Sequence, residues 1–454
     1  MTATSSRGLL RAVLTLVAGG AIAQALPLLL GPWLTRLYAP QQFGVYHLFA
    51  AVSANLAVVA CARYEFALPL VGDAADAAAL RALCLRVLAG VTGASAIGAA
   101  LWFAWSRDGW TVWLPVAVAV LGWLSLATLW ATRAQAYRAL AIARVVQYGG
   151  ASLAQAGAAL MGAGVQGLIV APIAAAAAAA AVLRLPLRDV DLATPLRSAQ
   201  DDRDLSSGAR SQDPDNDLSS CAKSQDPPRW RKLARRFRDF PLLNTPHAFM
   251  GALQDTAAIG IIAAWQGPVA AGFWGLSLRY LKAPATLVGG AVSQALYPQL
   301  AAHGASVDHD ADAHAPLRVT REGRAAVRRV MAGLAAIAAP LVLLLWAFAP
   351  WAFEALFGPA WRGAGELART LGLYIGVHFV AAPLAVVTLA WGAQAWALRL
   401  ALVGQVAFVA ALAAGLKLDG LPGAGWGVSI AMAVYFGYYF LRLATWPLTE
   451  KDPA

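Results

Sequence analysis

Long apolar runs dominate this 454-residue sequence and leave few folds open to it. A helix that crosses a bilayer needs about 20 mostly apolar residues in a row. Soluble domains are about half apolar and about a quarter charged, whereas this chain is 59% hydrophobic and 13% charged. We therefore predict an all-α polytopic membrane protein with about 12 transmembrane helices. The predicted spans are 10–34, 43–70, 83–105, 112–132, 139–161, 164–183, 240–265, 269–297, 330–350, 367–390, 397–416 and 424–446.

The first of these runs has two interpretations. The start, "MTATSSRGLLRAVLTLVAGG", has the charged prelude and apolar stretch of a signal peptide. The apolar run continues through Leu30, however, which makes it long enough to span a membrane. We predict a retained first helix.

The Lys and Arg residues predict the orientation of the chain. With an even number of spans and both termini inside, 27 of the 35 fall in inner loops and tails and five in outer loops. Without the long loop 184–238 the balance is still 15 against five. Short inner loops of membrane proteins carry this excess of positive charge. We predict cytoplasmic termini, and we interpret the net charge of +11 mostly as a topology signal rather than a nucleic-acid site.

A polar segment divides the chain into two halves. "DLSSGARSQDP" at 204–214 recurs as "DLSSCAKSQDP" at 217–227, and such Ser-, Asp- and Pro-rich sequence cannot bury a core. The basic, aromatic stretch "RWRKLARRFRDF" at 229–240 is predicted to lie along the anionic lipids of the cytoplasmic leaflet. The predicted domains are a six-helix bundle at 1–183, a disordered linker at 184–238 and a second six-helix bundle at 239–454.

The two halves share a short repeat. "APQQFGVYHL" at 39–48 aligns with "GPVAAGFWGL" at 267–276, so that Pro40 matches Pro268 and Gly44 matches Gly272. Both segments fall at the outer turn after the first span of their half, in the same orientation. This predicts a parallel repeat, with two six-helix bundles around a central cleft, an architecture typical of transporters. A duplicated scaffold without transport is the alternative.

Charged residues inside predicted spans are the candidate site, because such groups are costly in a bilayer and mark functional sites. Arg279 and Lys282 are three residues apart and project from nearly one helix face. Asp255 and Arg279 each lie 12 residues from Gly267, about 18 Å along their helices. One interpretation is a structural Asp255–Arg279 pair. Lys282 then remains as a surplus cation, which suits an anionic substrate.

Arg63 and Glu65 are predicted to lie at the cytoplasmic mouth. Counted along a continuous helix from a turn near residue 39, they lie about 36–39 Å away, beyond the core of about 30 Å. Residues two apart on a helix face different ways, so they are not predicted to pair with each other. One interpretation is a Glu65–Arg11 pair with a snorkelling arginine. The other is that Arg63 attracts a phosphorylated head group at the entrance.

The remaining titratable groups give weaker signals. His378, alone in an apolar span, is either a satisfied core histidine or a proton-coupling group. "VDHDADAH" at 307–314 lacks the glycine and glutamate of a calcium loop, and three scattered cysteines form no metal motif. We predict no metal and no cofactor.

Three segments resemble one family of membrane proteins. "PWLTRLYAPQQFGVYHLFAAVSANLAVVACARYEFALPL" at 32–70 is similar to the N-terminal signature of Wzx-type bacterial polysaccharide flippases, and the resemblance extends over most of the chain. "FRDFPLLNTPHAFMGAL" at 237–253 and "GFWGLSLRYLKAPATLVGGAVSQALYPQLA" at 272–301 resemble the start of the second half in the same family.

The resemblance implies membership of the multidrug/oligosaccharidyl-lipid/polysaccharide exporter superfamily. Such a protein moves an undecaprenyl-pyrophosphate-linked oligosaccharide across the bacterial inner membrane and is not an enzyme. A polysaccharide polymerase or export complex is then a candidate partner. The positions of the charged residues in the sequence suggest the site: Arg63 would attract the pyrophosphate at the mouth, and Arg279 with Lys282 would hold it in the cleft. Glu65, Asp255 or His378 could couple transport to a proton or sodium ion, and the role of Asp255 rests on its position alone.

Three alternatives are open. A cation-coupled multidrug exporter would prefer carboxylates over a cationic cleft. A membrane glycosyltransferase or polymerase would need catalytic carboxylates or a metal on a sizeable loop, and the predicted outer loops are short. A scaffold within an assembly complex would not need the buried cations.

Overall fold

The computed structural model describes residues 25–183, 229–304 and 319–448, and every regular element within these ranges is helical. Residues 25–37 form a helix. After it come α2 (Pro40–Val59), η1 (Tyr64–Leu70), α3 (Ala74–Ser106), η2 (Gly109–Trp113), α4 (Leu114–Arg133), α5 (Tyr137–Leu160) and the helix Gly164–Leu183. The later elements are α7 (Arg229–Arg236), η3 (Phe240–Asn244), α8 (Thr245–Leu281), α9 (Ala283–Gly304), α10 (Arg321–Phe357), η4 (Pro359–Trp361), α11 (Arg362–Ala390) and α12 (Gln394–Ala444).

Eight helices within the described residues are long and apolar enough to cross a membrane. They are Pro40–Val59, Ala74–Ser106, Gly109–Arg133, Gly164–Leu183, Ala248–Gly290, Arg321–Phe357, Pro359–Ala390 and Gln394–Ala444. The chain is thus an all-α, multi-pass membrane protein.

The number of candidate spans, eight, differs from the 12 predicted spans partly because two long helices contain kinks. α8 has a non-helical Gly267 with φ of 82°, and α12 has non-helical geometry at Asp419 and Gly420. Each kink falls between two predicted spans, so one helix stands for both. α5 covers a further predicted span but is not among the eight.

α2 also ends earlier than the predicted span 43–70. The helix stops at Val59, and Ala62 and Arg63 take left-handed backbone conformations with φ of 48° and 61°. The short 3₁₀-helix η1 then carries Glu65 and ends at Leu70. The depth predicted for Arg63 and Glu65 assumed a continuous helix, which the structure replaces with this turn.

The chain forms two compact units that do not follow chain order alone. Of the described residues, unit 1 comprises 25–30, 49–183 and 229–252, and unit 2 comprises 31–48, 253–304 and 319–448. Residues 31–48, predicted within the N-terminal bundle, therefore lie with unit 2. The basic stretch beginning at Arg229 lies with unit 1.

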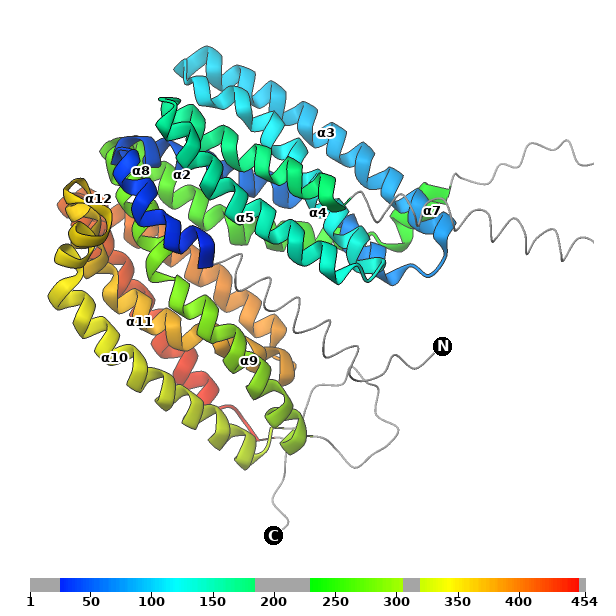
Figure 1. Ribbon diagram of the computed structural model, residues 1–454. Helices are drawn as coiled ribbons and strands as arrows, with labels where there is room; N and C mark the ends of the chain where they lie inside the picture. Colours follow the sequence, from blue (N-terminus) through cyan, green and yellow to red (C-terminus); the bar gives the residue numbers. More distant parts are fainter. Residues whose placement is uncertain (1–24, 184–228, 305–318, 449–454) are drawn as a thin grey trace, which may run out of the picture. The chain divides into compact units, whose positions relative to one another are not determined.

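In unit 1, α4 packs against both α3 and α5 (Figure 1). One core cluster joins α3, α4 and η1, and Leu233 of α7 is buried in it. The Tyr64 hydroxyl also donates a hydrogen bond to the carbonyl of Ala234, at 3.3 Å. α7 is thus docked on this unit through its single buried leucine, while its arginines remain on the exposed side.

In unit 2, α11 packs against α9, α10 and α12 and is the most buried of the eight candidate spans (Figure 1). The N-terminal segment 31–48 is tied to this unit by side chains far away in sequence. The Trp361 indole N–H donates to the Thr35 carbonyl at 2.9 Å, across 326 residues, and its ring meets Phe43 edge-on at 5.2 Å.

The two repeat segments contact each other within unit 2. A Cβ on Gly44 would lie 1.7 Å from the carbonyl oxygen of Pro268, and a Cβ on Gly272 would lie 2.1 Å from that of Pro40. The contact is reciprocal: each glycine faces the carbonyl of the proline at the start of the other segment. Only glycine leaves room for two backbones this close.

Candidate functional site

Lys282 lies at a break in the membrane-spanning region of unit 2. It separates the end of α8 from the start of α9, and Pro284 follows two residues later. Proline has no N–H to donate to the carbonyl four residues before it, so the helical ladder is interrupted here. Hydrogen bonds continue on both sides: Lys282 N–H donates to Leu278 at 3.0 Å, and Thr286 N–H donates to Lys282 at 3.1 Å. Broken helices of this kind place side chains and backbone at substrate sites in transporters.

An ion pair joins Lys282 to Asp255. The Lys282 Nζ lies 3.8 Å from Oδ1 of Asp255, and the two side chains are 26% and 62% exposed. Asp255 is the carboxylate that one interpretation of the sequence paired with Arg279. Counting from Gly267 puts Lys282 three residues further along the chain than Arg279, a rise of about 4.5 Å on a helix.

The exposure of Asp255 indicates the environment of its face of α8. A carboxylate in a membrane-spanning helix is costly when it faces lipid, and such residues normally face a protein interior or a water-filled cavity. Because Asp255 is mostly exposed on unit 2, this face of α8 suits a polar, hydrated surface rather than acyl chains.

Two aromatic side chains extend the site along α11. The Nζ of Lys282 lies 5.8 Å from the ring centroid of Tyr374, which is buried. The Tyr374 and His378 rings lie 5.7 Å apart, and His378 also meets Phe436 at 6.2 Å. The structure thus brings Asp255, Lys282 and His378 into one group, with Tyr374 between the lysine and the histidine.

Tyr374 was missed by the sequence analysis. The available signal was its spacing from His378, because residues four apart lie on the same helix face. The backbone N–H of Tyr374 donates to the Ser429 hydroxyl at 3.3 Å, and that hydroxyl donates to the Thr370 carbonyl at 2.6 Å. These bonds fix α11 against α12 at the level of the site.

Arg279 lies on α8 one turn before the break, near a second histidine. His47 of α2 packs on Gly275, where a Cβ would approach its ring to 2.3 Å. The His47 Nε2 is buried and has no hydrogen-bond partner within the described part of the chain. No sequence pattern indicated His47, since its contact with Gly275 depends on α2 crossing α8 in unit 2.

Arg63 lines a small pocket in unit 1. The pocket has a volume of about 230 Å³ and is formed by Arg63, Phe66, Phe240, Asn244 and Ala248. The guanidinium lies over the Phe66 ring, 4.6 Å from its centroid, and its Nε is buried without a hydrogen-bond partner in the described residues. Left-handed backbone is unusual for a residue with a Cβ, and such strain gathers at functional sites. The strained turn presents this cation to the pocket.

Glu65 is only 3% exposed. Its Oε1 accepts a hydrogen bond from the Ser125 hydroxyl at 3.4 Å, while Oε2 has no partner among the residues that the structure describes. Burial raises the pKa of the Glu65 carboxyl, and the nearby Arg63 and Ser125 partly offset this. Arg11, the partner suggested by one interpretation, lies outside the described residues.

The acidic stretch 307–314 and most of the polar linker also lie outside the described residues. Within residues 25–183, 229–304 and 319–448, no group of three or more His, Cys, Asp or Glu side chains is arranged to hold a metal ion.

The helices and their spans define a multi-pass membrane protein, and its fold is similar to that of solved MATE proteins and of the flippase MurJ. No protein-family model and no curated protein sequence matches the chain. The likeness is therefore one of structure.

Three solved structures illustrate the likeness. The lipid II flippase MurJ in an inward closed conformation matches with a TM-score of 0.61 and 7% identity, over 94% of this chain and 89% of that one. A MATE protein in complex with MaL6 matches with a TM-score of 0.56 and 14% identity, over 96% and 94%. An outward-facing multidrug resistance MATE family transporter of the MOP superfamily matches with 0.52 and 15%, over 96% and 94%.

Proposed function

We propose that this protein is a flippase that moves an undecaprenyl-pyrophosphate-linked oligosaccharide from the cytoplasmic to the periplasmic leaflet of the bacterial inner membrane. The observation that carries the proposal is Lys282, a cation placed at a helix break within a spanning region and held by a mostly exposed carboxylate. A pyrophosphate is the type of group that such a cation would bind. The similarity in fold to a protein described as a lipid II flippase supports the same reading.

The proposed mechanism is alternating access between two six-helix bundles around a central cleft. Arg63 attracts the pyrophosphate at the entrance, and Arg279 with Lys282 holds it deeper in the cleft while the lipid tail stays in the bilayer. Both termini are cytoplasmic in this proposal. A polysaccharide polymerase or export complex would receive the flipped unit.

The Lys282–Asp255 pair has the right strength for this role. Exposed ion pairs contribute about 0–1 kcal/mol, and Asp255 is 62% exposed. A pyrophosphate carries more negative charge than one carboxylate and can therefore replace Asp255 at the lysine. Asp255, once released, becomes free to take up a proton or sodium ion, as could Glu65 or His378.

A cation-coupled drug exporter is the second candidate. The observation that favours it is the same exposed Asp255, since a carboxylate on a hydrated face could bind an organic cation. The likeness to a multidrug resistance MATE family transporter is compatible with it.

A reconstituted translocation assay separates the two. Purified protein in liposomes is given a fluorescent undecaprenyl-pyrophosphate oligosaccharide or ethidium, with and without proton and sodium gradients. We expect flipping of the lipid-linked sugar, and a loss of about tenfold or more in the double variant R279Q/K282Q. R399Q, which removes an exposed cation of α12, is the control. Ethidium transport without flipping would favour the exporter, and no transport of either would favour a scaffold.

A further inference from the structure

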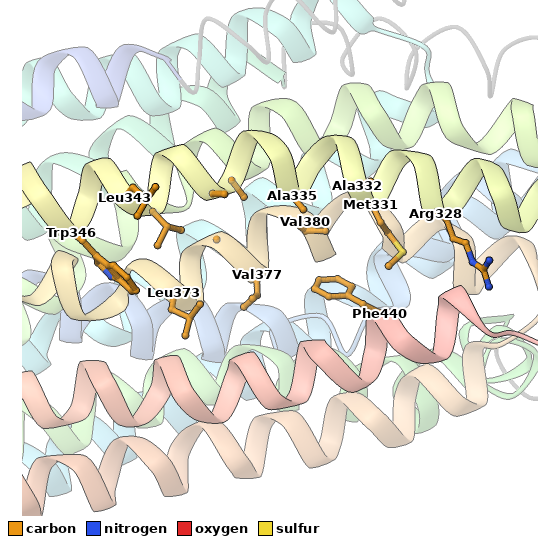
Figure 2. Close-up of a pocket in the computed structure, with 14 residues that line it drawn as sticks. Arg328, Met331, Ala332, Ala335, Leu343, Trp346, Leu373, Val377, Val380 and Phe440 are labelled. Carbon is orange, nitrogen blue, oxygen red and sulfur yellow. The ribbon is translucent and has the colours of Figure 1, made fainter.

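An apolar groove runs along α10 on unit 2, outside the group formed by Asp255, Lys282 and His378. Its volume is about 660 Å³, and α10, α11 and α12 all contribute to its walls (Figure 2). The groove is lined by aliphatic and aromatic side chains, among them Met331, Ala335, Val377 and Phe440. The exceptions are Arg328 at one end and the indole N–H of Trp346 toward the other. The alanines Ala332, Ala335 and Ala339 keep it open, because larger side chains on α10 would fill it.

The length of the groove matches the thickness of a membrane. Arg328 and Trp346 line its two ends along α10 and are 18 residues apart, which is about 27 Å of helix. The hydrocarbon core of a bilayer is about 30 Å thick. Arginine and tryptophan are side chains that favour the two interfaces. The apolar walls between them therefore cover most of the hydrocarbon core.

The Arg328 end is cationic and is hydrogen-bonded to the end of α12. The Arg328 Nε donates to the Ala444 carbonyl at 2.9 Å, and Arg324 donates to the Trp446 carbonyl at 3.2 Å. Arg442 lies over the Trp446 ring at 5.1 Å. Three guanidinium groups thus gather around the last turn of α12 and the residues after it. Arg328 donates to Ala444 through both Nε and Nη2, so this guanidinium would attract a phosphate through its charge and its remaining Nη1.

We propose that this groove binds the isoprenoid chain of a polyisoprenyl phosphate, with its phosphate at the Arg328 end. Length decides between this occupant and a phospholipid: an acyl chain covers one leaflet, about half of the 30 Å core, whereas the groove is nearly twice that long. The inference rests on the proposed function for its ligand class. It adds a tail-binding site that is separate from the Lys282 group.

A matched pair of variants tests the groove. Ala335 lines it, while the neighbouring Ala336 is also exposed on α10 but does not line it. The probe is undecaprenyl phosphate added to purified full-length protein and counted by native mass spectrometry. We expect A335F to weaken 1:1 binding about tenfold and A336F to bind as the wild type does. Equal binding by A335F and the wild type would overturn the proposal.

Two further measurements identify the occupant. Phosphatidylglycerol in equal amount should displace little undecaprenyl phosphate; full displacement would mean that the groove holds phospholipid instead. R328Q should reduce the preference for undecaprenyl phosphate over undecaprenol. Because Arg328 also tethers α12, the melting temperature of R328Q is measured, and the A335F result stands independently if that variant unfolds.

The test separates this inference from the proposed function. Retained binding of undecaprenyl phosphate with no flipping in liposomes would contradict the proposed flippase function but not the lipid-binding groove. Normal flipping by A335F, together with unchanged binding of undecaprenyl phosphate, would contradict the lipid-binding groove but not the proposed flippase function.

Discussion

The ammonium group of Lys282 lies 3.8 Å from the carboxylate of Asp255. Lys282 stands at a break in the helical ladder, and the kink at Gly267 lies between the two residues in the sequence. The distance is that of an ion pair without a short hydrogen bond, and the attraction is weak because Asp255 is mostly exposed. A pair of this kind can be exchanged for another anion, and its variants should separate stability from transport.

D255N should leave the protein folded and strengthen binding of a pyrophosphate probe. Asp255, the residue that is changed, is 62% exposed, so loss of its charge should change the free energy of unfolding by about 1 kcal/mol. With the competing carboxylate neutralised, Lys282 should bind an undecaprenyl pyrophosphate probe several-fold more tightly. Thermal melting and native mass spectrometry measure the two effects, with D255E as the charge-retaining control. Weaker binding by D255N would contradict the competition between Asp255 and the substrate.

R63N should reduce loading while keeping the fold. Asparagine tolerates the left-handed conformation of this residue better than most side chains, so the variant removes the cation without adding strain. We expect the KM for the lipid-linked substrate to rise about tenfold with kcat nearly unchanged. A drop in kcat alone would show that Arg63 acts after loading.

Glu65 should make stability depend on pH, and the sign follows from burial. Its folded-state pKa is raised above its ordinary value, so the folded protein holds this proton more tightly than the unfolded chain. The free energy of unfolding therefore falls as pH rises from the ordinary value toward the raised one. Below the ordinary value the protonated carboxyl brings no penalty.

E65Q mimics the protonated form and gives the test. It should melt at a higher temperature than the wild type at neutral pH, and the difference should shrink as the pH falls. A difference that stays constant across this range would show that Glu65 does not titrate in the way burial predicts.

G272A should be strongly destabilising. Its new Cβ would meet the Pro40 carbonyl oxygen at 2.1 Å, a backbone atom that cannot rotate away. Overpacking of this kind typically costs about 1–3 kcal/mol. G437A on α12 is the control, because nothing lies within 4 Å of its added methyl group. Melting temperatures in detergent compare them, and equal values would contradict the close backbone approach.

L233A should undock α7 from unit 1. Leu233 is buried in a core cluster with η1 and α3, and leucine-to-alanine changes in cores cost about 2–5 kcal/mol. We expect faster proteolysis after the basic residues of α7 in this variant. R235A, an exposed neighbour on the same helix, should be cleaved no faster than the wild type.

The sequence predicted the helices well where length and apolar character decide the structure. It could not predict where α2 ends, because Ala62 and Arg63 carry no glycine or proline signal for their left-handed turn. Pro284 was visible in the sequence, yet its neighbour Lys282 was placed within a continuous span. Apolar content does not reveal a kink.

The candidate site was predicted as a set of residues rather than as a geometry. Asp255, Lys282 and His378 lie together. The residue that pairs with Asp255 is Lys282, three residues after Arg279. Tyr374 and His47 were missed because aromatic residues in apolar helices look like ordinary core. Their importance comes from α11 and α2 packing beside α8, and such long-range contacts are not encoded in spacing.

The hydrogen bond from Trp361 to Thr35 has a consequence for biosynthesis. A ribosome adds about 5–20 residues per second, so the 326 residues between the two partners take roughly 15–65 s to make. Throughout that interval the segment 31–48 has been synthesised, but its packing surface is not yet complete, because Trp361 is still missing. Until Trp361 is made, Phe43 and Thr35 remain in the insertion machinery or the bilayer without this partner. The second half of the chain therefore completes the folding of the first, and a fragment ending at the linker would expose this unfinished surface to quality-control proteases.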